Sequence, residues 1–456
     1  MRFRSIAAAS LAGAVALSTL AACGSSGESK NEITIAYQRN TNNNVRYMDN
    51  FLGTVKKQFE KSHPGKTVKL VPIQATENDY YTKLDLMMKS PRTAPDLAYE
   101  DTFLINSDIK AGFLQPIDSR VKTWSQWSKF FPTAKKSVTA LDGKVYGVPD
   151  GTDTRGIWYD KRIFRKAGLP TTWQPKSWDD LLAAARQIKK KVPGVTPMNV
   201  YTGKANGEYA AMQGFEMLLY GTDDQLYNPQ QKKWVVGSKG FRDSLQFYKT
   251  VYSTGLAPKP SAALDANIAN NINLEWLPAS KIGFTIDGSF TANNWLPTGG
   301  KPWKQWSKDL GWAAMPTQHG QAPGKTSMSG GWSWAITRQA KNPDLAWEFI
   351  KSMQTEKNAM AYDNASQNIA VRSDVAADPE YLKAAPTVKF FTDLVKYTHY
   401  RPAYAEYPKL STAITEQQEA VTTGSSSPAQ AAADYDKAVR DIVGAGHTTK
   451  VSGTKQ

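Results

Sequence analysis

Cysteine is almost absent from this chain of 456 residues, which contains Cys23 and no other. A single cysteine excludes a disulfide framework and a zinc site built from several thiolates. Histidine is also scarce, and its four positions lack the spacing of paired metal ligands: His63, His319, His399 and His447. We therefore expect no zinc or non-haem iron site, and we expect the protein to need no cofactor.

The motifs of nucleotide-binding and hydrolytic enzymes are lacking as well. The stretch from Gly320 to Thr326 imitates a phosphate-binding loop, but its two glycines stand one position too close together. Pro323 also removes a backbone N–H that such a loop needs. No G-x-S-x-G sequence, which marks the nucleophile of many hydrolases, occurs in the chain. We interpret residues 320–326 as a surface turn.

Acidic residues are fewer than basic ones, with 41 Asp and Glu against 56 Lys and Arg and a formal net charge of +15. Such an excess is typical of proteins that bind polyanions such as nucleic acids. The lysine clusters are short, however, and each fits a solvated helix face or a turn: 56–57, 135–136, 189–191 and 232–233. We expect no nucleic-acid partner. The excess charge suits anionic lipid headgroups or wall polymers instead.

A long apolar run occurs only at the N-terminus. A short basic stretch that ends at Arg4 precedes the Ala-rich run from Ile6 to Leu20, which is too short for a permanent transmembrane helix. We interpret residues 1–22 as a signal peptide. The sequence Leu-Ala-Ala-Cys that ends at Cys23 resembles a bacterial lipobox, in which the cysteine thiol accepts a diacylglycerol.

Cys23 is therefore the predicted lipidation site, and residues 23–30 form a flexible tether rich in glycine and serine. This arrangement predicts a protein held by its lipid on the outer, extracellular face of the cytoplasmic membrane. The alternative is a signal peptide without lipidation, in which the cysteine occurs by chance.

Strand and helix patterns alternate in the rest of the chain. Strands are expected at 32–37, 67–73 and 96–99, with helices at 45–63 and 79–90 between them. Further amphipathic helices are expected at 177–188, 344–353 and 428–442. This order predicts an α/β fold with a mostly parallel sheet and helices on both faces. The length predicts two domains or lobes.

Large aromatic residues stand beside glycines in two places. Trp332 and Trp334 follow Gly330 and its neighbour, and Phe290 and Trp295 follow a turn at Asp287-Gly288. Glycine lets a ligand approach the backbone closely, and a flat aromatic face suits the C–H surface of a sugar ring. The alternative is that most of the 14 tryptophans fill the core.

Two blocks stand close together in the first half of the chain, Ala94-Pro-Asp-Leu-Ala-Tyr-Glu-Asp and Ala111-Gly-Phe-Leu-Gln-Pro-Ile-Asp. They resemble blocks of the family 1 extracellular solute-binding proteins, the carbohydrate-binding lipoproteins of ABC importers, to which maltose-binding protein is related. The other blocks follow in the family's order, and the resemblance covers roughly residues 31 to 443: 141–149, 156–161, 175–181, 281–288 and 330–336.

The resemblance implies a two-lobed, periplasmic-binding-protein-like fold of type II, with a ligand cleft between the lobes. It implies crossover segments near 150–154, 328–331 and 369–372. The N-terminal lobe would comprise 31–151 and 332–370, and the C-terminal lobe 152–331 and 371–443. Residues 444–456 would form a tail, which we expect to be frayed.

The resemblance also implies where the ligand would be contacted. Positions that match binding loops of the family are Gln38, Arg39, Asp101, Asp153, Glu208, Tyr209, Asp287, Phe290 and Arg401. Phe290 replaces a stacking tryptophan that is common in the family, so Trp295, Trp332 and Trp334 are further candidates for the platform. The loop at 40–44 is expected to cap or narrow one end of the cleft.

We therefore predict a monomeric binding protein that captures a neutral di- or oligosaccharide and performs no chemistry. Its partners would be two permease subunits of an ABC importer, with the ATPase on a separate chain. One alternative is an exported glycosidase that uses Asp101 with Asp153 or Glu208. Another alternative is a receptor for a polyamine, a metal ion or an anion.

Overall fold

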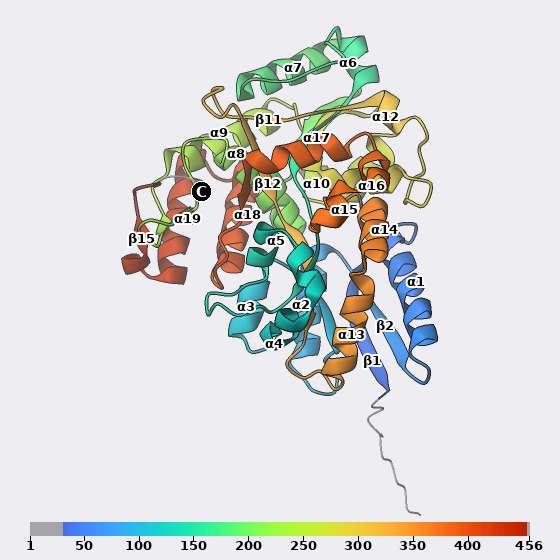
Figure 1. The fold of residues 1–456 in the computed structure, drawn as a ribbon. Helices are drawn as coiled ribbons and strands as arrows, with labels where there is room; N and C mark the ends of the chain where they lie inside the picture. The colour runs from blue at the N-terminus through green and yellow to red at the C-terminus, as the bar shows by residue number, and fades with distance from the viewer. Residues whose placement is uncertain (1–30, 454–456) are drawn as a thin grey trace, which may run out of the picture.

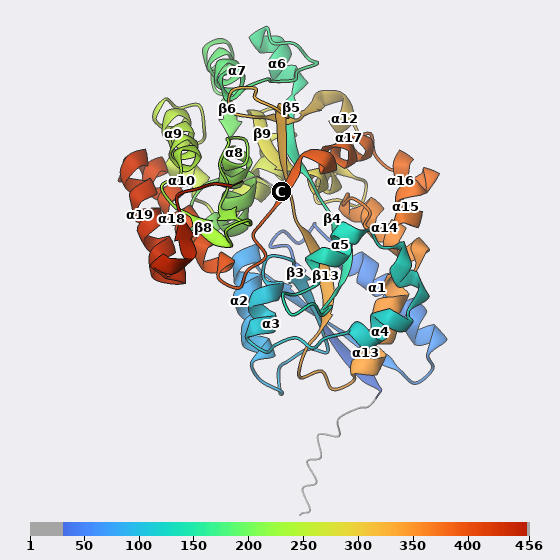
Figure 2. The ribbon, with the colours of Figure 1, turned by 60° about the vertical axis from the view of Figure 1, so that its left-hand side comes forward.

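The computed structural model describes residues 31–453, so the predicted signal peptide, Cys23 and the tether lie outside the described residues. Two lobes make up the molecule, and Figures 1 and 2 show the N-terminal lobe below the C-terminal one. The chain enters the lower lobe from below at β1 (Glu32–Arg39). Each lobe is built around its own sheet.

The N-terminal lobe contains a five-stranded sheet. Its strands lie in the order β2 (Thr67–Gln74), β1, β3 (Leu97–Asp101), β13 (Gly331–Ile336) and β4 (Val148–Thr152). β1 pairs in parallel with β2 and β3, whereas β13 runs antiparallel to β3 and β4. The sheet is thus mostly parallel, as the alternating pattern predicts.

Helices cover both faces of this sheet. The longer ones include α1, whose buried residues Met48, Leu52, Val55 and Phe59 follow the helical period and pack against α13 and the sheet. The helices of this lobe are α1 (Tyr47–Ser62), α2 (Glu77–Met88), α3 (Ile105–Lys110), α4 (Asp118–Thr123), η1 (Ser125–Lys129), α5 (Pro132–Ser137), α13 (Pro343–Met353) and α14 (Glu356–Ser366).

The C-terminal lobe contains a four-stranded sheet and two small ones. The larger sheet has the order β10 (Leu310–Ala313), β5 (Arg155–Asp160), β9 (Ile282–Gly288) and β6 (Thr196–Asn199). The small sheets are β11 (Met315–Pro316), β12 (Lys325–Ser329) and β14 (Thr398–Tyr400), and β15 (Thr448–Thr449), β8 (Lys233–Val235) and β7 (Tyr227–Asn228).

Helices of the C-terminal lobe flank these sheets. α7 begins after Ser177, whose hydroxyl accepts a hydrogen bond from the backbone N–H of Asp180, as the sequence predicts. The longer helices are α6 (Lys161–Ala167), α7 (Trp178–Lys191), π-helix η3 (Tyr209–Glu216), α9 (Lys239–Ser253), α18 (Tyr407–Thr423) and α19 (Pro428–Val443). The shorter ones are η2 (Lys204–Asn206), α8 (Met217–Leu219), α10 (Pro260–Ala263), α11 (Ile268–Asn270), η4 (Asn271–Trp276), η5 (Ser289–Trp295), α12 (Trp306–Asp309), α15 (Ser373–Ala377), α16 (Pro379–Lys383), α17 (Val388–Asp393), η6 (Leu394–Tyr397) and η7 (Ala445–His447).

The strand that enters each sheet from the other lobe is the one that runs against its neighbours. β4 leads directly into β5, and β12 leads directly into β13. β5 is antiparallel to β9 and β10, as β13 is to β3 and β4. A strand that comes directly from the other lobe begins at the junction and runs away from the junction. Its first residues therefore lie at the cleft, beside the carboxyl ends of the neighbouring strands. Arg155 is the first residue of β5, and Trp332 is the second residue of β13.

The C-terminal segment differs from the expected frayed tail. Thr448 and Thr449 form β15, which pairs in parallel with β8, and the carbonyl of Val451 accepts a hydrogen bond from Asn228. This pairing uses backbone groups of an exposed strand edge, so it leaves no hydrophobic periodicity in the sequence. Among residues 31–453, none of the helices has both the length and the apolar character to span a bilayer.

Candidate functional site

A cavity of about 190 Å³ lies between the two lobes, where the strand ends meet. Both lobes supply its wall. Eight of the residues singled out in the sequence line it: Gln38, Asp101, Asp153, Glu208, Tyr209, Phe290, Trp332 and Arg401. The cavity is therefore the place where ligand-binding chemistry can be sought in the described part of the chain.

Aromatic rings form part of the wall. Trp332 stacks on Tyr99, with ring centroids 4.7 Å apart and planes at 11°. In the other lobe Tyr209 meets Phe290 edge-on at 6.4 Å. Trp332, Tyr209 and Phe290 are only half-buried, so each keeps a ring surface that a ligand can contact.

Arg401 joins two carboxylates from opposite lobes. Its Nη2 donates to Asp101 Oδ1 over 2.6 Å, and its Nη1 donates to Glu208 Oε2 over 3.0 Å. All three side chains are buried. Burial alone would lower the pKa of Arg401, but the charges of Asp101 and Glu208 outweigh it and raise the pKa well above the ordinary value. One buried cation is thus shared by two carboxylates, and the triad keeps a formal charge of −1.

Glu77, the first residue of α2, adds a neutral carboxyl group to the wall. Burial raises the pKa of Glu77 to about 8, and the charge of Asp101 contributes to the rise. The hydroxyl of Tyr81 donates to Asp101 over 2.9 Å and lies 2.8 Å from Glu77 Oε1. At neutral pH Glu77 is thus protonated and adds no charge to the cavity.

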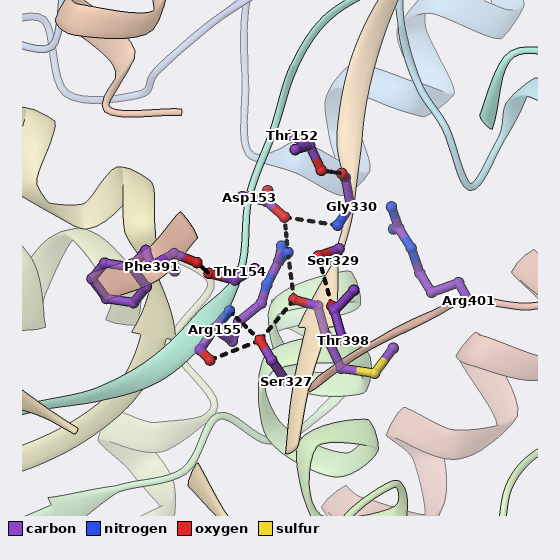
Figure 3. A network of polar contacts seen from close by, with 12 residues as sticks. Thr152, Asp153, Thr154, Arg155, Ser327, Ser329, Gly330, Phe391, Thr398 and Arg401 are labelled. Carbon is purple, nitrogen blue, oxygen red and sulfur yellow. Dashed lines mark hydrogen bonds and ion pairs between the residues drawn. The ribbon is translucent and has the colours of Figure 1, made fainter. Parts of the chain in front are cut away.

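A second charge pair belongs to the junction between the lobes, which Figure 3 shows from close by. Asp153 forms an ion pair with Arg155 and also accepts a hydrogen bond of 2.7 Å from the backbone N–H of Gly330. The backbone N–H of Arg155 donates to Ser327, whose hydroxyl donates back to the Arg155 carbonyl. The two crossing segments are thereby tied side by side, and Asp153 is neutralised.

Arg39 and Trp334, two of the predicted residues, lie away from the cavity because of their positions on strands. Gln38 and Arg39 are adjacent in β1, so they point to opposite faces. Arg39 binds Asp49 of α1, with Nε 2.9 Å from Oδ1. Trp334 lies on β13 two residues further from the cleft than Trp332 and is fully buried in the core against Tyr99.

Asp287 and Trp295 lie behind the wall and support Asn273, which is part of it. Asp287 is fully buried and accepts hydrogen bonds from Asn273 Nδ2 over 3.1 Å and from the Tyr201 hydroxyl over 2.8 Å. The indole of Trp295 donates to the Asn273 carbonyl over 2.7 Å. Asp287 and Trp295 are placed to position Asn273 rather than to touch a ligand.

Amide side chains are the part of the wall that our sequence reasoning missed. Nine of the described lining residues are asparagines, and they come from both lobes: Asn40, Asn78, Asn206, Asn267, Asn270, Asn273, Asn293, Asn294 and Asn368. The sequence holds a signal for some of them, since asparagines cluster at 40–44 and 267–273. Isolated asparagines such as Asn206 carry no such signal.

Hydrogen bonds between these amides connect the lobes. Asn270 Nδ2 donates to Asn40 Oδ1 over 3.2 Å and to Thr41 Oγ1 over 3.1 Å, and the Thr41 hydroxyl donates to Asn267 over 3.0 Å. Asn78 Nδ2 donates to the Lys204 carbonyl over 3.2 Å. The loop at 40–44 therefore touches the opposite lobe, and the structure represents a form in which the lobes are closed over the cavity.

Some buried polar atoms of the wall have no hydrogen-bond partner among the described residues. They include a donor, Arg155 Nε, and two acceptors, Gln213 Oε1 and Asn273 Oδ1. Buried polar groups are normally satisfied, so these atoms are suited to a ligand that offers both donors and acceptors. Residues 31–453 contain no group of three or more His, Cys, Asp or Glu side chains that could hold a metal ion.

Two α/β lobes with a polar cavity at their junction define the class of two-lobed solute-binding proteins. The family model described as bacterial extracellular solute-binding protein matches residues 44–360, and the chain belongs to this family. The family resemblance noted in the sequence is thereby confirmed.

Known relatives share the overall architecture at low sequence identity. A galactooligosaccharide-binding protein of Bacillus subtilis is 23% identical over 396 residues, which cover 86% of each chain. A solute-binding protein of Thermotoga lettingae, solved with α-D-tagatose, has a TM-score of 0.77 and 22% identity over 90% of this chain and 99% of that chain. Maltose-bound MalE3 of T. maritima has a TM-score of 0.78 and 20% identity over 90% and 100%. These likenesses confirm the predicted two-lobed α/β fold.

Proposed function

We propose that this protein captures a neutral di- or oligosaccharide in the cleft between its lobes and delivers it to an ABC importer. The importer would consist of two permease subunits and a separate ATPase chain. The binding protein would act as a monomer, need no cofactor and leave its cargo unchanged. Relatives named for oligosaccharide binding and solved structures that hold sugars support this proposal.

The observation that carries the proposal is the internal pairing of the charges in the cavity. Arg401 is paired with Asp101 and Glu208, and Arg155 with Asp153. A charged solute would have to compete with these partners or enter without a counterion, which is costly in a buried site. A neutral ligand avoids that cost. This argument disfavours the anion alternative most, because one cation and two carboxylates leave a formal charge of −1. A polyamine or a metal ion would have to displace Arg401 from its carboxylates.

The rest of the wall supports a sugar among neutral ligands. Amides offer one acceptor and two donors each, and a sugar hydroxyl can act as either partner. The half-buried rings of Trp332, Tyr209 and Phe290 offer flat apolar surfaces for the C–H faces of the sugar. In this proposal the amides select the pattern of hydroxyls, and the rings hold the pyranose planes.

The pairing of Asp101 and Glu208 also bears on the glycosidase alternative. Hydrolysis needs one carboxyl group that holds a transferable proton beside the scissile bond. One guanidinium donates hydrogen bonds to both of these carboxylates. Asp153 is likewise held by Arg155 and the Gly330 N–H. The three carboxylates named in the glycosidase alternative are therefore held by cations, which supports binding. Glu77 is the protonated carboxyl group that remains in the wall, and the test for sugar consumption covers it.

The proposed attachment to the membrane depends on Cys23, which precedes the described residues. We expect Cys23→Ala to release the protein into the medium, because an acyl chain contributes about 0.8 kcal/mol per buried CH₂ to membrane binding. Fractionation of cells that express the variant measures this. A variant that is correctly exported but stays in the membrane fraction would contradict the anchor.

Thermal unfolding with a panel of neutral di- and trisaccharides tests the proposed function. A ligand that binds only the folded state adds RT ln(1 + [L]/Kd), about 4 kcal/mol at a thousandfold excess over Kd. We expect a large shift with one sugar or a small set, and no loss of the sugar on long incubation. Consumption of the sugar would support the glycosidase, and a shift only with charged solutes would overturn the neutral ligand.

A further inference from the structure

A basic and aromatic segment in the N-terminal lobe has no role in the cavity. Between Ser119 and Leu141 the sequence contains five basic residues and no acidic one. The segment spans α4, η1 and α5. We call its exposed or half-exposed basic and aromatic residues the basic aromatic patch: Lys122, Trp127, Lys129, Phe131, Lys135 and Lys136.

Apolar and charged groups are interleaved in this patch. Lys135 Nζ lies 5.5 Å from the centre of the Trp127 ring, and Trp127 stacks on Trp124 at 6.5 Å. Phe131 keeps 37% of its surface exposed, although large apolar side chains are normally covered. Rings that are half in contact with the protein and flanked by lysines are typical of surfaces that sit at a membrane interface.

The lysines of the patch are free to meet an external anion. No ion pair joins any of the four to an acidic side chain within residues 31–453, whereas Arg120 in the same segment is paired with Asp344 over 2.7 Å. Each unpaired lysine near an anionic surface contributes attraction, and the contributions add up over a cluster.

The patch starts at α4, at the end of the molecule where β1 begins, and extends along the side of the lobe to α5, which Figures 1 and 2 show nearer the other lobe. Arg120 pairs with Asp344 at the start of α13, and Asn342 Nδ2 donates to the carbonyl of Glu32, the first residue of β1, over 2.6 Å. Figures 1 and 2 both show α4 and α13 beside this entry point. Eight residues lie between Cys23 and Glu32, and the two ends of this stretch are at most about 30 Å apart when it is extended. A lipid at Cys23 would therefore keep this end of the lobe near the membrane.

We propose that the basic aromatic patch docks on anionic lipid headgroups and orients the N-terminal lobe on the membrane. The lysines would meet the phosphates, and Trp127 and Phe131 would enter the headgroup layer. A polyanion without an apolar layer, such as a wall polymer, would use the lysines but not the rings. The contribution of Phe131 therefore distinguishes a lipid surface from a soluble polymer.

Vesicle binding by the chain from residue 31 onward tests the patch without the lipid anchor, since every contact of the two lobes described above lies after this residue. The probes are vesicles of phosphatidylcholine alone and of phosphatidylcholine with phosphatidylglycerol in equal amounts. We expect binding only to the second kind, and we expect added NaCl to weaken it. Replacement of the four patch lysines by glutamine should lower the partition coefficient at least about tenfold, and Phe131→Ser should lower it several-fold.

The control variant removes the same charge from the opposite end of the molecule. Lysines 166, 190, 191 and 249 are exposed on α6, α7 and α9, far from the entry point in Figure 1, and are also changed to glutamine. We expect this variant to bind vesicles almost as the parent does. Equal losses in the two variants, or equal binding of the parent to both kinds of vesicle, would overturn the proposal. Vesicle binding by Phe131→Ser equal to that of the parent would show that the rings do not enter the headgroup layer. The partner of the patch would then be an anionic polymer and not a lipid surface. None of these outcomes affects the proposed sugar capture.

Discussion

Arg401 is the residue on which the charge balance of the cavity depends. It satisfies Asp101 from one lobe and Glu208 from the other, and Glu208 is also bound by the hydroxyl of Ser411. Sequence comparison alone suggested that Arg401 and Asp101 each contact the ligand. The structure shows that they contact each other, so their first effect is on the stability of the closed form.

We expect Arg401→Met to lower the free energy of unfolding by about 3–5 kcal/mol, because it leaves two buried carboxylates without their cation. Unfolding in urea measures the loss. The triple variant Arg401→Met with Asp101→Asn and Glu208→Gln is the control, and it should recover much of the stability since no buried charge remains. A single variant as stable as the parent would show that the bridge contributes little.

Glu77, which is half-buried in the cavity wall, and Glu216, which is fully buried, should make the stability depend on pH in the neutral range. Burial raises the pKa of Glu77 and of Glu216 to about 8 from an ordinary 4.5, helped by the charges of Asp101 and Glu208 respectively. The folded state therefore holds protons that the unfolded chain releases. For these two groups alone, the free energy of unfolding is highest below about pH 4.5. As the pH rises from there to about 8, each group lowers the free energy of unfolding by at most about 1.4 kcal/mol per pH unit.

We expect Glu77→Gln to flatten the dependence of unfolding free energy on pH between 5 and 8, since glutamine has no proton to lose. Glu216→Gln should do the same for its own share. Urea unfolding at several pH values measures both. The slope of the parent should exceed that of either variant, and identical slopes in all three proteins would contradict the raised pKa values.

At the scale of single elements, the two tryptophans of β13 lie in different surroundings. Trp332 lies opposite Asp101 at the cleft end of the strand, whereas Trp334 lies opposite Tyr99 in the core. The sequence block Gly-Gly-Trp-Ser-Trp gives no means of telling the two apart. Their difference follows from where the strand begins relative to the junction, which only the packed sheet determines.

We expect Trp332→Ala to weaken sugar binding by about 1–3 kcal/mol, because a half-buried stacking surface is lost, and to destabilise the fold less than the loss of the fully buried Trp334. Trp334→Ala should lower the free energy of unfolding by about 3–5 kcal/mol, because it opens a cavity in the core. Calorimetric titration and urea unfolding of both variants separate the effects. Unchanged affinity in Trp332→Ala would remove this ring from the proposed binding surface.

Elements with clear periodicity could be predicted well from the sequence. The helix expected at 45–63 is α1 (Tyr47–Ser62), and that expected at 428–442 is α19 (Pro428–Val443). The π-helix η3 was missed because six of its residues in a row, Ala210 to Phe215, are buried and no polar face marks it. The local sequence pattern also could not predict that β13 lies between β3 and β4, since both neighbours are far away in the chain.

At the scale of the whole molecule, the contacts between asparagines across the cleft oppose opening. Asn270 reaches Asn40 and Thr41 of the other lobe, whereas the adjacent Asn271 bonds only to Asp265 of its own lobe. Each hydrogen bond contributes about 0.5–1.5 kcal/mol to the closed form. The two adjacent asparagines therefore provide a matched pair of variants.

We expect Asn270→Ala to shift the sugar-free protein toward an open form and to weaken sugar binding by about 5- to 30-fold, because closure is part of the binding free energy. Asn271→Ala should leave both properties unchanged. Small-angle X-ray scattering without ligand and titration with the sugar measure the two effects. Equal behaviour of the two variants would mean that the amide contacts do not hold the lobes together.

The insertion of β13 between β3 and β4 also governs the order in which the protein can fold. A ribosome makes β3 and β4 long before β13, so the nascent N-terminal lobe has a gap in its sheet until residue 336 has been made. The C-terminal lobe cannot be completed before α18 and α19 have been made. These two helices lie near the end of the chain and pack on α9. Neither lobe can complete its core early, so we expect the polypeptide to fold late in its synthesis. A chain that folds so late remains in a form that can pass through a narrow export channel.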